Sequence, residues 1–307
     1  MSVFQDPFDT IHKDVRSIFR PQREWINRQG LILVAAHFLS GIGAGAWIMG
    51  WLLQSKSGLW LGFSAVALSG LAHFFFLGSP LRFWRMITRP QASWISRGFI
   101  GISVFLPSAF LYLISEGEVS PFSQAMLVIS LISAGLITFY KGFVYASARP
   151  IPFWNSPILP PLYILYAFRG GAALIMAALP FMDQATINLH LLEISKFWIV
   201  LSSAVLILFY LLTMSASGVG ARHSVQEILK GQVVLPFYVG VVLIGLVVPL
   251  AIGVRVFFDS SVGVWAMFLI AIASLVGDFF IVFTINRAGI FMPLVGRFTA
   301  SSQVKEH

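Results

Sequence analysis

The chain has 307 residues, of which 58% are hydrophobic and only 10% are charged, and its formal net charge is +8. Soluble domains carry about 25% charged residues, so this composition excludes an ordinary soluble protein and indicates a chain surrounded by lipid. Cysteine is absent, which excludes disulfides, thiolate-bound zinc and iron–sulfur clusters from this chain.

Residues 1–29 precede the first apolar run and contain several basic residues. Over residues 9–20, Ile11, Val15 and Ile18 share one helical face with basic residues elsewhere, which is typical of a helix lying in the membrane interface. A disordered basic tail is the alternative. The segment lacks an apolar core of the length that a secretory signal peptide needs, so we expect no cleaved signal.

Eight apolar runs follow, each long enough to cross a hydrocarbon layer of ~30 Å as a helix. They span residues 30–54, 58–78, 94–115, 122–147, 158–181, 192–215, 234–256 and 262–287, with proline and glycine clusters between them. The sequence therefore predicts an all-α integral membrane protein, with eight transmembrane helices over residues 30–287 and a tail over 288–307. The stretches GIGAGAWIMG and RGGAALIMAA, in the first and fifth spans, favour two four-helix bundles, although close packing alone explains them equally well.

The basic residues are distributed unequally between the two sides of the membrane. An even number of spans puts both chain ends on one side, and the positive-inside rule makes that side the cytoplasm, with the protein in the inner membrane. The opposite side holds Lys56, Lys196 and Arg255. The side of the chain ends holds Lys13, Arg16, Arg20, Arg23, Arg28, Arg82, Arg85, Arg89, Arg97, Lys141, Arg149, Arg222, Lys230, Arg287, Arg297 and Lys305. This positive charge also suits the docking of an acidic soluble partner.

Two histidines lie inside the predicted spans, where an ionisable residue needs a reason. His37 is near the start of the first span and His73 near the end of the second, so the two rings should lie at similar depth, roughly 8–11 Å below the surface. They can donate to a quinone carbonyl and carry its protons, because histidine titrates near neutral pH. Structural hydrogen bonding and bis-histidine haem ligation are the alternatives.

A second ionisable pair lies deeper, with Arg169 in the fifth span and Asp278 in the eighth. Their depths allow a buried ion pair, and pairing removes most of the penalty of burying either charge. The pair either stabilises the packing of the two helices, or it allows Asp278 to accept and release protons. A transporter with Arg169 and Asp278 as its midplane site is the rival hypothesis from another class of protein.

Tyr145 ends the fourth span between Lys141 and Arg149. A phenol in this place can hydrogen-bond a quinone oxygen, whereas an aromatic-belt tyrosine is the ordinary alternative. We expect the side chain of Lys141 to extend to the membrane surface.

Two loops on the side of the chain ends combine arginine, tryptophan and proline. The loop after the second span carries Arg82, Trp84 and Arg85, and the loop after the fourth carries Arg149 and Trp154. We expect these residues to form a docking surface for a redox partner above the histidines.

The loops resemble those of a known family. LGSPLRFWRMITRPQASWISRG (77–98) is similar to the loop between the second and third spans of NrfD-type polysulfide reductase subunits and dimethyl sulfoxide reductase anchor subunits. YASARPIPFWNSP (145–157) resembles their loop after the fourth span, and Gly277-Asp278 their Gly–acid pair in the last span. In the dimethyl sulfoxide anchors a histidine directly precedes LGSP, whereas here that place is Phe76 and His73 lies one turn earlier.

The resemblance implies a quinone-reactive membrane anchor of a molybdopterin oxidoreductase, which does not itself act on the substrate of the complex. Its expected partners are a four-cluster iron–sulfur subunit, a molybdopterin catalytic subunit and membrane lipid, and no nucleic acid. The expected cofactor is menaquinone or ubiquinone, bound near His37, His73, Tyr145 and Asp278, without haem. A haem b-containing anchor and a small secondary transporter remain the alternatives.

Overall fold

The computed structural model describes residues 19–22, 26–27, 30–77, 80–115, 120–181, 189–255 and 263–292. Within these ranges, eight helices are long and apolar enough to cross a membrane. Most of the interfacial helix predicted over residues 9–20, and most of the C-terminal tail, lie outside the described residues.

Each predicted span corresponds to one helix, with ends that differ by a few residues. The spanning elements are α2 (Gly30–Leu52), α3 (Lys56–Phe76), α4 (Trp94–Ile114), α5 (Pro121–Ala146), α6 (Leu159–Ala178) with the 3-10 turn η3 (Leu179–Phe181), α7 (Leu189–Ala216), the π-helix η4 (Pro236–Val247) continued by α9 (Val248–Gly253), and α11 (Val264–Ala288). Shorter elements are the 3-10 helix η2 (Pro80–Ile87), α8 (Val219–Lys230), and the strands β1 (Arg20–Pro21) and β2 (Ile290–Phe291).

Serine residues define where three of the helices begin. The hydroxyls of Ser55, Ser93 and Ser120 accept hydrogen bonds from backbone N–H groups in the first turns of α3, α4 and α5. A helix start leaves backbone N–H groups without intrahelical partners, and a serine at the N-cap satisfies one of them. Satisfying backbone groups within the segment matters most in lipid, which offers no hydrogen bonds in return.

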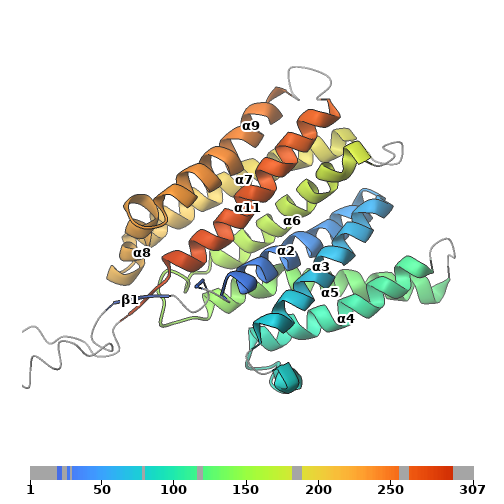
Figure 1. Cartoon of the computed structure of the whole chain (residues 1–307), viewed down its shortest axis with the longest axis horizontal. Coiled ribbons are helices and arrows are strands. Elements are labelled where there is room, and N and C mark those ends of the chain that lie inside the picture. Colours follow the sequence, from blue (N-terminus) through green and yellow to red (C-terminus); the bar gives the residue numbers. More distant parts are fainter. Residues whose placement is uncertain are drawn as a thin grey trace, which may run out of the picture.

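The helices form two groups that meet along α2 and α6 (Figure 1). Helices α2 to α5 make one group, and α6, α7, η4 with α9, and α11 make the other. Because α2 and α6 are central, they are the most buried helices. In their apolar 18-residue stretches 61% and 67% of the residues are buried, against 28% in α3 and in α7. Gly45 permits this close approach, because a Cβ there would lie 1.8 Å from the backbone oxygen of Ala167.

Both ends of the membrane domain lie at the same end of the bundle (Figure 1). The strand β1 pairs antiparallel with β2, with Arg20 opposite Phe291, and the N–H of Met292 donates to the backbone oxygen of Pro150 at 2.9 Å. The ring of Phe19 lies 5.1 Å from that of His223 in α8. We call this end, with β1, β2, α8, η2 and the loop at 147–158, the terminal face, and the other end the opposite face.

Candidate functional site

A cavity of about 430 Å³ lies between α2, α3, η2, α4 and α5, near the terminal face. Its walls are mainly apolar, with Phe74, Phe83 and Phe99 among the lining side chains. The polar groups that line it are chiefly the imidazoles of His37 and His73 and the phenol of Tyr140. The cavity is therefore an apolar chamber with a small number of polar groups, which is the usual composition of a small-molecule site.

The two histidines predicted from the sequence come together at this cavity. Their ring centroids are 5.6 Å apart, with the ring planes tilted by 47°. They come from the adjacent antiparallel helices α2 and α3. A hydrogen bond from the hydroxyl of Ser69 in α3 to the backbone oxygen of Ala36 in α2, at 2.8 Å, links the two helices. The expectation that both rings lie at one depth is thus met by the geometry.

Hydrogen bonds outside the cavity orient the His37 ring. The amide of Asn286 donates to the backbone oxygen of Val282 at 2.8 Å, which leaves its Oδ1 to accept from the Tyr145 hydroxyl at 3.0 Å. The phenol oxygen then accepts from Nδ1–H of His37 at 2.8 Å. In the neutral ring, Nε2 of His37 is consequently a proton acceptor.

A hydrogen bond to the backbone of its own helix fixes the tautomer of His73. Its Nδ1 lies 2.8 Å from the backbone oxygen of Ser69, and a carbonyl oxygen can only accept. Nδ1 therefore carries the proton, and Nε2 is the basic nitrogen of the neutral ring. Both histidines share this tautomer, so each can receive one proton at Nε2 and later return it.

Lys141 does not extend to the membrane surface as predicted; its residue is only 2% exposed. Its ammonium donates to the backbone oxygen of His37 at 2.7 Å and to the hydroxyl of Ser40 at 3.1 Å. Gly41 provides the room, because a Cβ at that position would lie 2.9 Å from Nζ of Lys141. The prediction was wrong because two acceptors inside the bundle stabilise the cation there.

The second ionisable pair is formed in the other helix group. Nε and Nη2 of Arg169 lie 2.6 Å and 2.5 Å from Oδ1 of Asp278, and both residues are buried. Lys196 joins them by donating to the backbone oxygen of Arg169 at 2.7 Å. The predicted position of Lys196 at the opposite surface is wrong, because α7 begins at Leu189, earlier than predicted, and turns this side chain inward.

Asp278 is predicted to lie beside the quinone with the histidines, and the structure separates it from them. It does not belong to the described residues that line the cavity. Its carboxylate is instead held in α11 by Arg169 of α6. Gly277, the first member of the Gly–acid pair, packs against Gly245 of η4 with no room for a side chain.

The expected docking residues fall into two classes. Arg82, Trp84, Arg85 and Arg149 are exposed on the terminal face, with Trp84 at 54%. Trp154 is a correction, because it is buried and its indole N–H donates to the backbone oxygen of Ile285 at 2.7 Å. Its ring packs 5.0 Å from that of Tyr145, so Trp154 supports the phenol that orients His37.

Several residues of the site were missed by sequence reasoning, namely Asn286, Tyr140 and the inward positions of Lys141 and Lys196. An asparagine near the end of an apolar span was the one available signal for Asn286. Within the described part of the chain, no group of three or more His, Cys, Asp or Glu residues is arranged to hold a metal ion.

In the part of the chain that the structure describes, eight apolar helices around buried polar clusters define a multi-pass membrane protein. The family described as polysulphide reductase, NrfD, matches residues 27–293, so the chain belongs to this family, whose members are membrane subunits of redox complexes. Protein NrfD of Escherichia coli K12 is 24% identical over 296 residues, covering 82% of this chain and 92% of that protein. The C subunit of polysulfide reductase from Wolinella succinogenes is 24% identical over 253 residues, covering 71% of this chain and 80% of its own length. A Haemophilus influenzae NrfD homolog is 27% identical over 182 residues, covering 57% of this chain and 54% of its own length.

Proposed function

We propose that this chain is the quinone-reactive membrane anchor of a molybdopterin-type oxidoreductase complex. It exchanges electrons between an iron–sulfur subunit and the quinone pool at the cavity beside His37 and His73. The observation that carries the proposal is the meeting of two imidazoles, both with Nδ1 hydrogen-bonded to the protein, at the wall of an apolar cavity of about 430 Å³.

The cavity suits a lipid-soluble ligand in size and access. Ligand sites typically measure about 300–1,000 Å³ and combine apolar walls with a few polar groups. Phe74 and Ile95 line the cavity and are also 45% and 51% exposed on the outer surface of the helices. A quinone can therefore enter from the bilayer, with its tail left among apolar side chains and its head group near the histidines.

The histidines supply the proton chemistry. A bound quinone takes up two electrons and two protons to become the quinol, and the reverse reaction releases them. In the reducing direction, protonated His37 and His73 give up protons from Nε2, and in the oxidising direction the neutral rings accept them there. Tyr145 keeps Nδ1 of His37 occupied, so proton exchange is confined to the other nitrogen. When it is protonated, the Lys141 amine bound to the backbone oxygen of His37 favours negative charge that develops on the ligand.

The terminal face suits an acidic iron–sulfur partner. The helix η2 contributes Phe83 and Met86 to the cavity wall and presents Arg82 and Arg85 outward, so a partner bound there lies next to the quinone. The absence of cysteine means that the clusters are held by that partner. A molybdopterin subunit completes the complex, and the positive charge of the terminal face favours its cytoplasmic orientation in the inner membrane.

The histidines provide the test of this proposal. We expect His37→Ala or His73→Ala to slow quinol-coupled turnover by roughly 100-fold, the usual range for loss of a general acid or base. Turnover is measured with a short-chain quinol, and assembly by co-purification of the iron–sulfur subunit. His190→Ala, at an exposed histidine in the first turn of α7 on the opposite face, is the matched control and should leave both unchanged. Full turnover in both cavity variants would mean that these histidines have structural roles only.

The absorption spectrum of the purified protein distinguishes the haem-binding alternative from the quinone site. A pair of imidazoles 5.6 Å apart is the specific feature that a haem b anchor would also use. A Soret band that His37→Ala and His73→Ala abolish would support the haem-containing anchor in place of the quinone site.

A further inference from the structure

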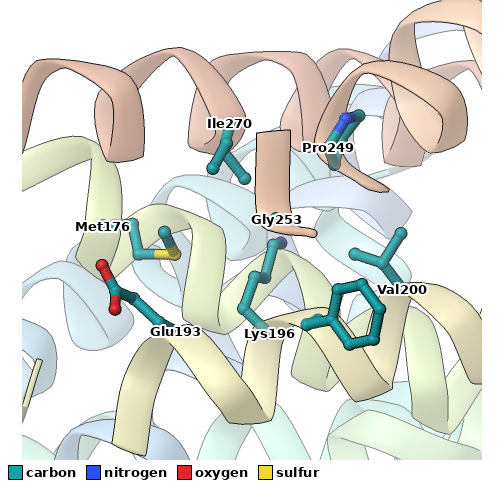
Figure 2. A pocket seen from close by; sticks show the side chains of 8 residues that line it. Met176, Glu193, Lys196, Val200, Pro249, Gly253 and Ile270 are labelled. Atoms are coloured by element: carbon teal, nitrogen blue, oxygen red, sulfur yellow. The ribbon is translucent and has the colours of Figure 1, made fainter. Parts of the chain in front are cut away.

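A hollow of about 620 Å³ lies where the two helix groups meet at the terminal face. It is bounded by the start of α2, the start of η4 and the last turns of α11, which Figure 1 shows ending between α8 and α2. We call it the seam hollow, and its lining includes Asn27, Leu31, Gln232, Pro236, Phe283 and Arg287. The cavity beside Glu193 and Lys196 in Figure 2, with about 20 Å³, has room for one water molecule only. The seam hollow, by contrast, is large enough for the head group of a lipid.

Two side-chain amides hold Arg287 at the seam hollow. Its Nη1 donates to Oδ1 of Asn27 at 3.0 Å, and its Nη2 donates to Oε1 of Gln232 at 3.1 Å. A guanidinium can only donate, so the oxygen of each amide faces it and the two NH₂ groups remain donors. The seam hollow therefore gathers hydrogen-bond donors around one positive charge.

The charge of Arg287 is not balanced by an acid within the seam hollow. Among the described residues that line the hollow there is no carboxylate. Glu227 of α8 directs its carboxylate to the backbone N–H of Gln232 at 3.1 Å and lines a separate hollow of α8. A cation among neutral donors attracts an anion, because hydrogen bonds to a charged acceptor are the stronger ones, and it offers no partner for an ammonium group.

Arg287 lies at the level where the head groups of lipids are found. The helix α8 runs across the direction of the spanning helices (Figure 1), with Arg222, His223 and Lys230 exposed along it, as is typical of a helix at the membrane surface. Arg287 belongs to the last turn of α11, and α11 contacts α8. Basic pockets between membrane helices at this level are typical of sites for acidic lipid head groups.

Apolar side chains continue from Arg287 toward the bilayer. Leu31 of α2 is 47% exposed and Phe283, one turn before Arg287, is half-buried. Deeper in the membrane, the half-buried rings of Phe38 in α2 and Phe279 in α11 meet edge to face with centroids 5.7 Å apart. An acyl chain can lie along this wall, whereas a water-soluble anion would use only the donors and leave the wall uncovered.

We infer that the seam hollow binds an anionic phospholipid. Its phosphate accepts hydrogen bonds from Arg287 and from the amides of Asn27 and Gln232, and an acyl chain packs against Leu31 and Phe283. The lipid contacts α2 of one helix group and both η4 and α11 of the other, so it stabilises the junction of the two groups. This inference goes beyond the proposed quinone function and does not depend on it.

The position of the lipid also connects it to the histidine cavity. Asn286, which directly precedes Arg287 in α11, accepts the hydrogen bond of the Tyr145 hydroxyl, and that hydroxyl orients His37. A lipid bound to Arg287 therefore restrains the end of the helix on which this arrangement depends.

The test is lipid binding to the purified full chain after its lipids have been removed in detergent. Native mass spectrometry counts bound dioleoylphosphatidylglycerol, which is anionic, and dioleoylphosphatidylcholine, which is zwitterionic. We expect the anionic lipid to bind more tightly and to raise the melting temperature, because a ligand of the folded state stabilises it. Arg287→Gln should weaken its binding by about tenfold or more. Arg222→Gln, at an exposed arginine of α8, is the matched control and should not.

Asn27→Asp keeps the experiment decisive if Arg287→Gln fails to fold. The new carboxylate would compensate the charge of Arg287 at an exposed position, so the protein should fold and lose the anionic lipid. Unchanged affinity for dioleoylphosphatidylglycerol in the variants that fold would overturn the inference, as would equal affinity of the wild type for dioleoylphosphatidylcholine. Glycerol phosphate binding as tightly as the lipid would mean an anion site without a lipid. Variants that bind the lipid normally but lose the iron–sulfur partner would place Arg287 in the docking surface instead.

Discussion

Arg169 and Asp278 illustrate how one side chain depends on another when both are out of water. The carboxylate of Asp278 is paired with the guanidinium of Arg169, and neither side chain is exposed to solvent. Removing one member of a buried pair leaves the other charge without compensation, which costs about 3–5 kcal/mol. With Lys196 bound to the backbone of Arg169, loss of the carboxylate would leave two cations in one cluster.

We therefore expect Asp278→Asn to reduce the yield and thermal stability of the folded protein, and the double variant Asp278→Asn with Arg169→Gln to restore them. Stability is measured as the melting temperature in detergent. If the restored double variant turns over quinol at the normal rate, the pair is structural. Slow turnover would assign Asp278 a part in proton transfer. Glu227→Gln, in surface helix α8, controls for removal of a carboxylate elsewhere.

A single Asp278→Asn variant that is both stable and fully active would contradict this account of the pair. The charge of Arg169 would then be compensated by something other than Asp278. The prediction is specific because a buried arginine without a partner stays charged, whereas a lysine can lose its proton and become neutral.

At the scale of helices, glycines determine how closely α2 approaches α6. A Cβ at Gly45 would meet the backbone of Ala167, and one at Gly171 would meet the backbone of Gly45 at 2.2 Å. Backbone atoms cannot move aside as a flexible side chain can. The similar small-residue stretches of the first and fifth spans are therefore explained by one shared helix crossing.

Gly45→Ala should separate α2 from α6 and destabilise the protein by about 1–3 kcal/mol or more, the usual range for overpacking. The measurement is the melting temperature in detergent, followed by quinol turnover, since α2 also carries His37. Gly135→Ala is the matched control, because a Cβ there meets nothing within 4 Å and alanine favours a helix more than glycine does. Equal stability of the two variants would mean that the helices do not cross at Gly45.

At the scale of the whole molecule, the distribution of charge distinguishes the two faces. Exposed arginines lie on η2 and in the loop after α5, while Lys56 and Arg255 are exposed on the opposite face. Charges that attract a partner act over ~8–10 Å at moderate salt and are screened at high salt. The terminal face should therefore bind an acidic subunit in a salt-dependent manner.

Arg82→Glu and Arg85→Glu should release the iron–sulfur partner at lower salt than the wild type does. The check is the amount of partner that remains bound to the immobilised chain as sodium chloride is increased. Lys56→Glu has the same charge change on the other face and should behave like the wild type. Retention of the partner by both arginine variants at high salt would mean that these arginines only set the topology.

Much of this architecture could be predicted from the sequence because it depends on local properties. Hydropathy and the length of each run decide whether a segment spans the membrane, and neighbouring residues decide where the segment ends. The eight spans of the described residues, their helical nature and the common side of the two ends of the membrane domain follow from such properties. The similar depth of His37 and His73 follows as well, because adjacent spans joined by a short turn are antiparallel.

The directions of the polar side chains depended on the tertiary structure. Lys141, Trp154 and Lys196 lie near span ends, where the sequence favours the membrane surface, yet all three are buried because acceptors on distant helices receive their hydrogen bonds. The sequence also cannot show that Asp278 faces Arg169 and not the histidines, since that depends on which helix group each span joins. Hydropathy is a property of each segment, whereas a hydrogen bond in lipid depends on the partner that packing places opposite it.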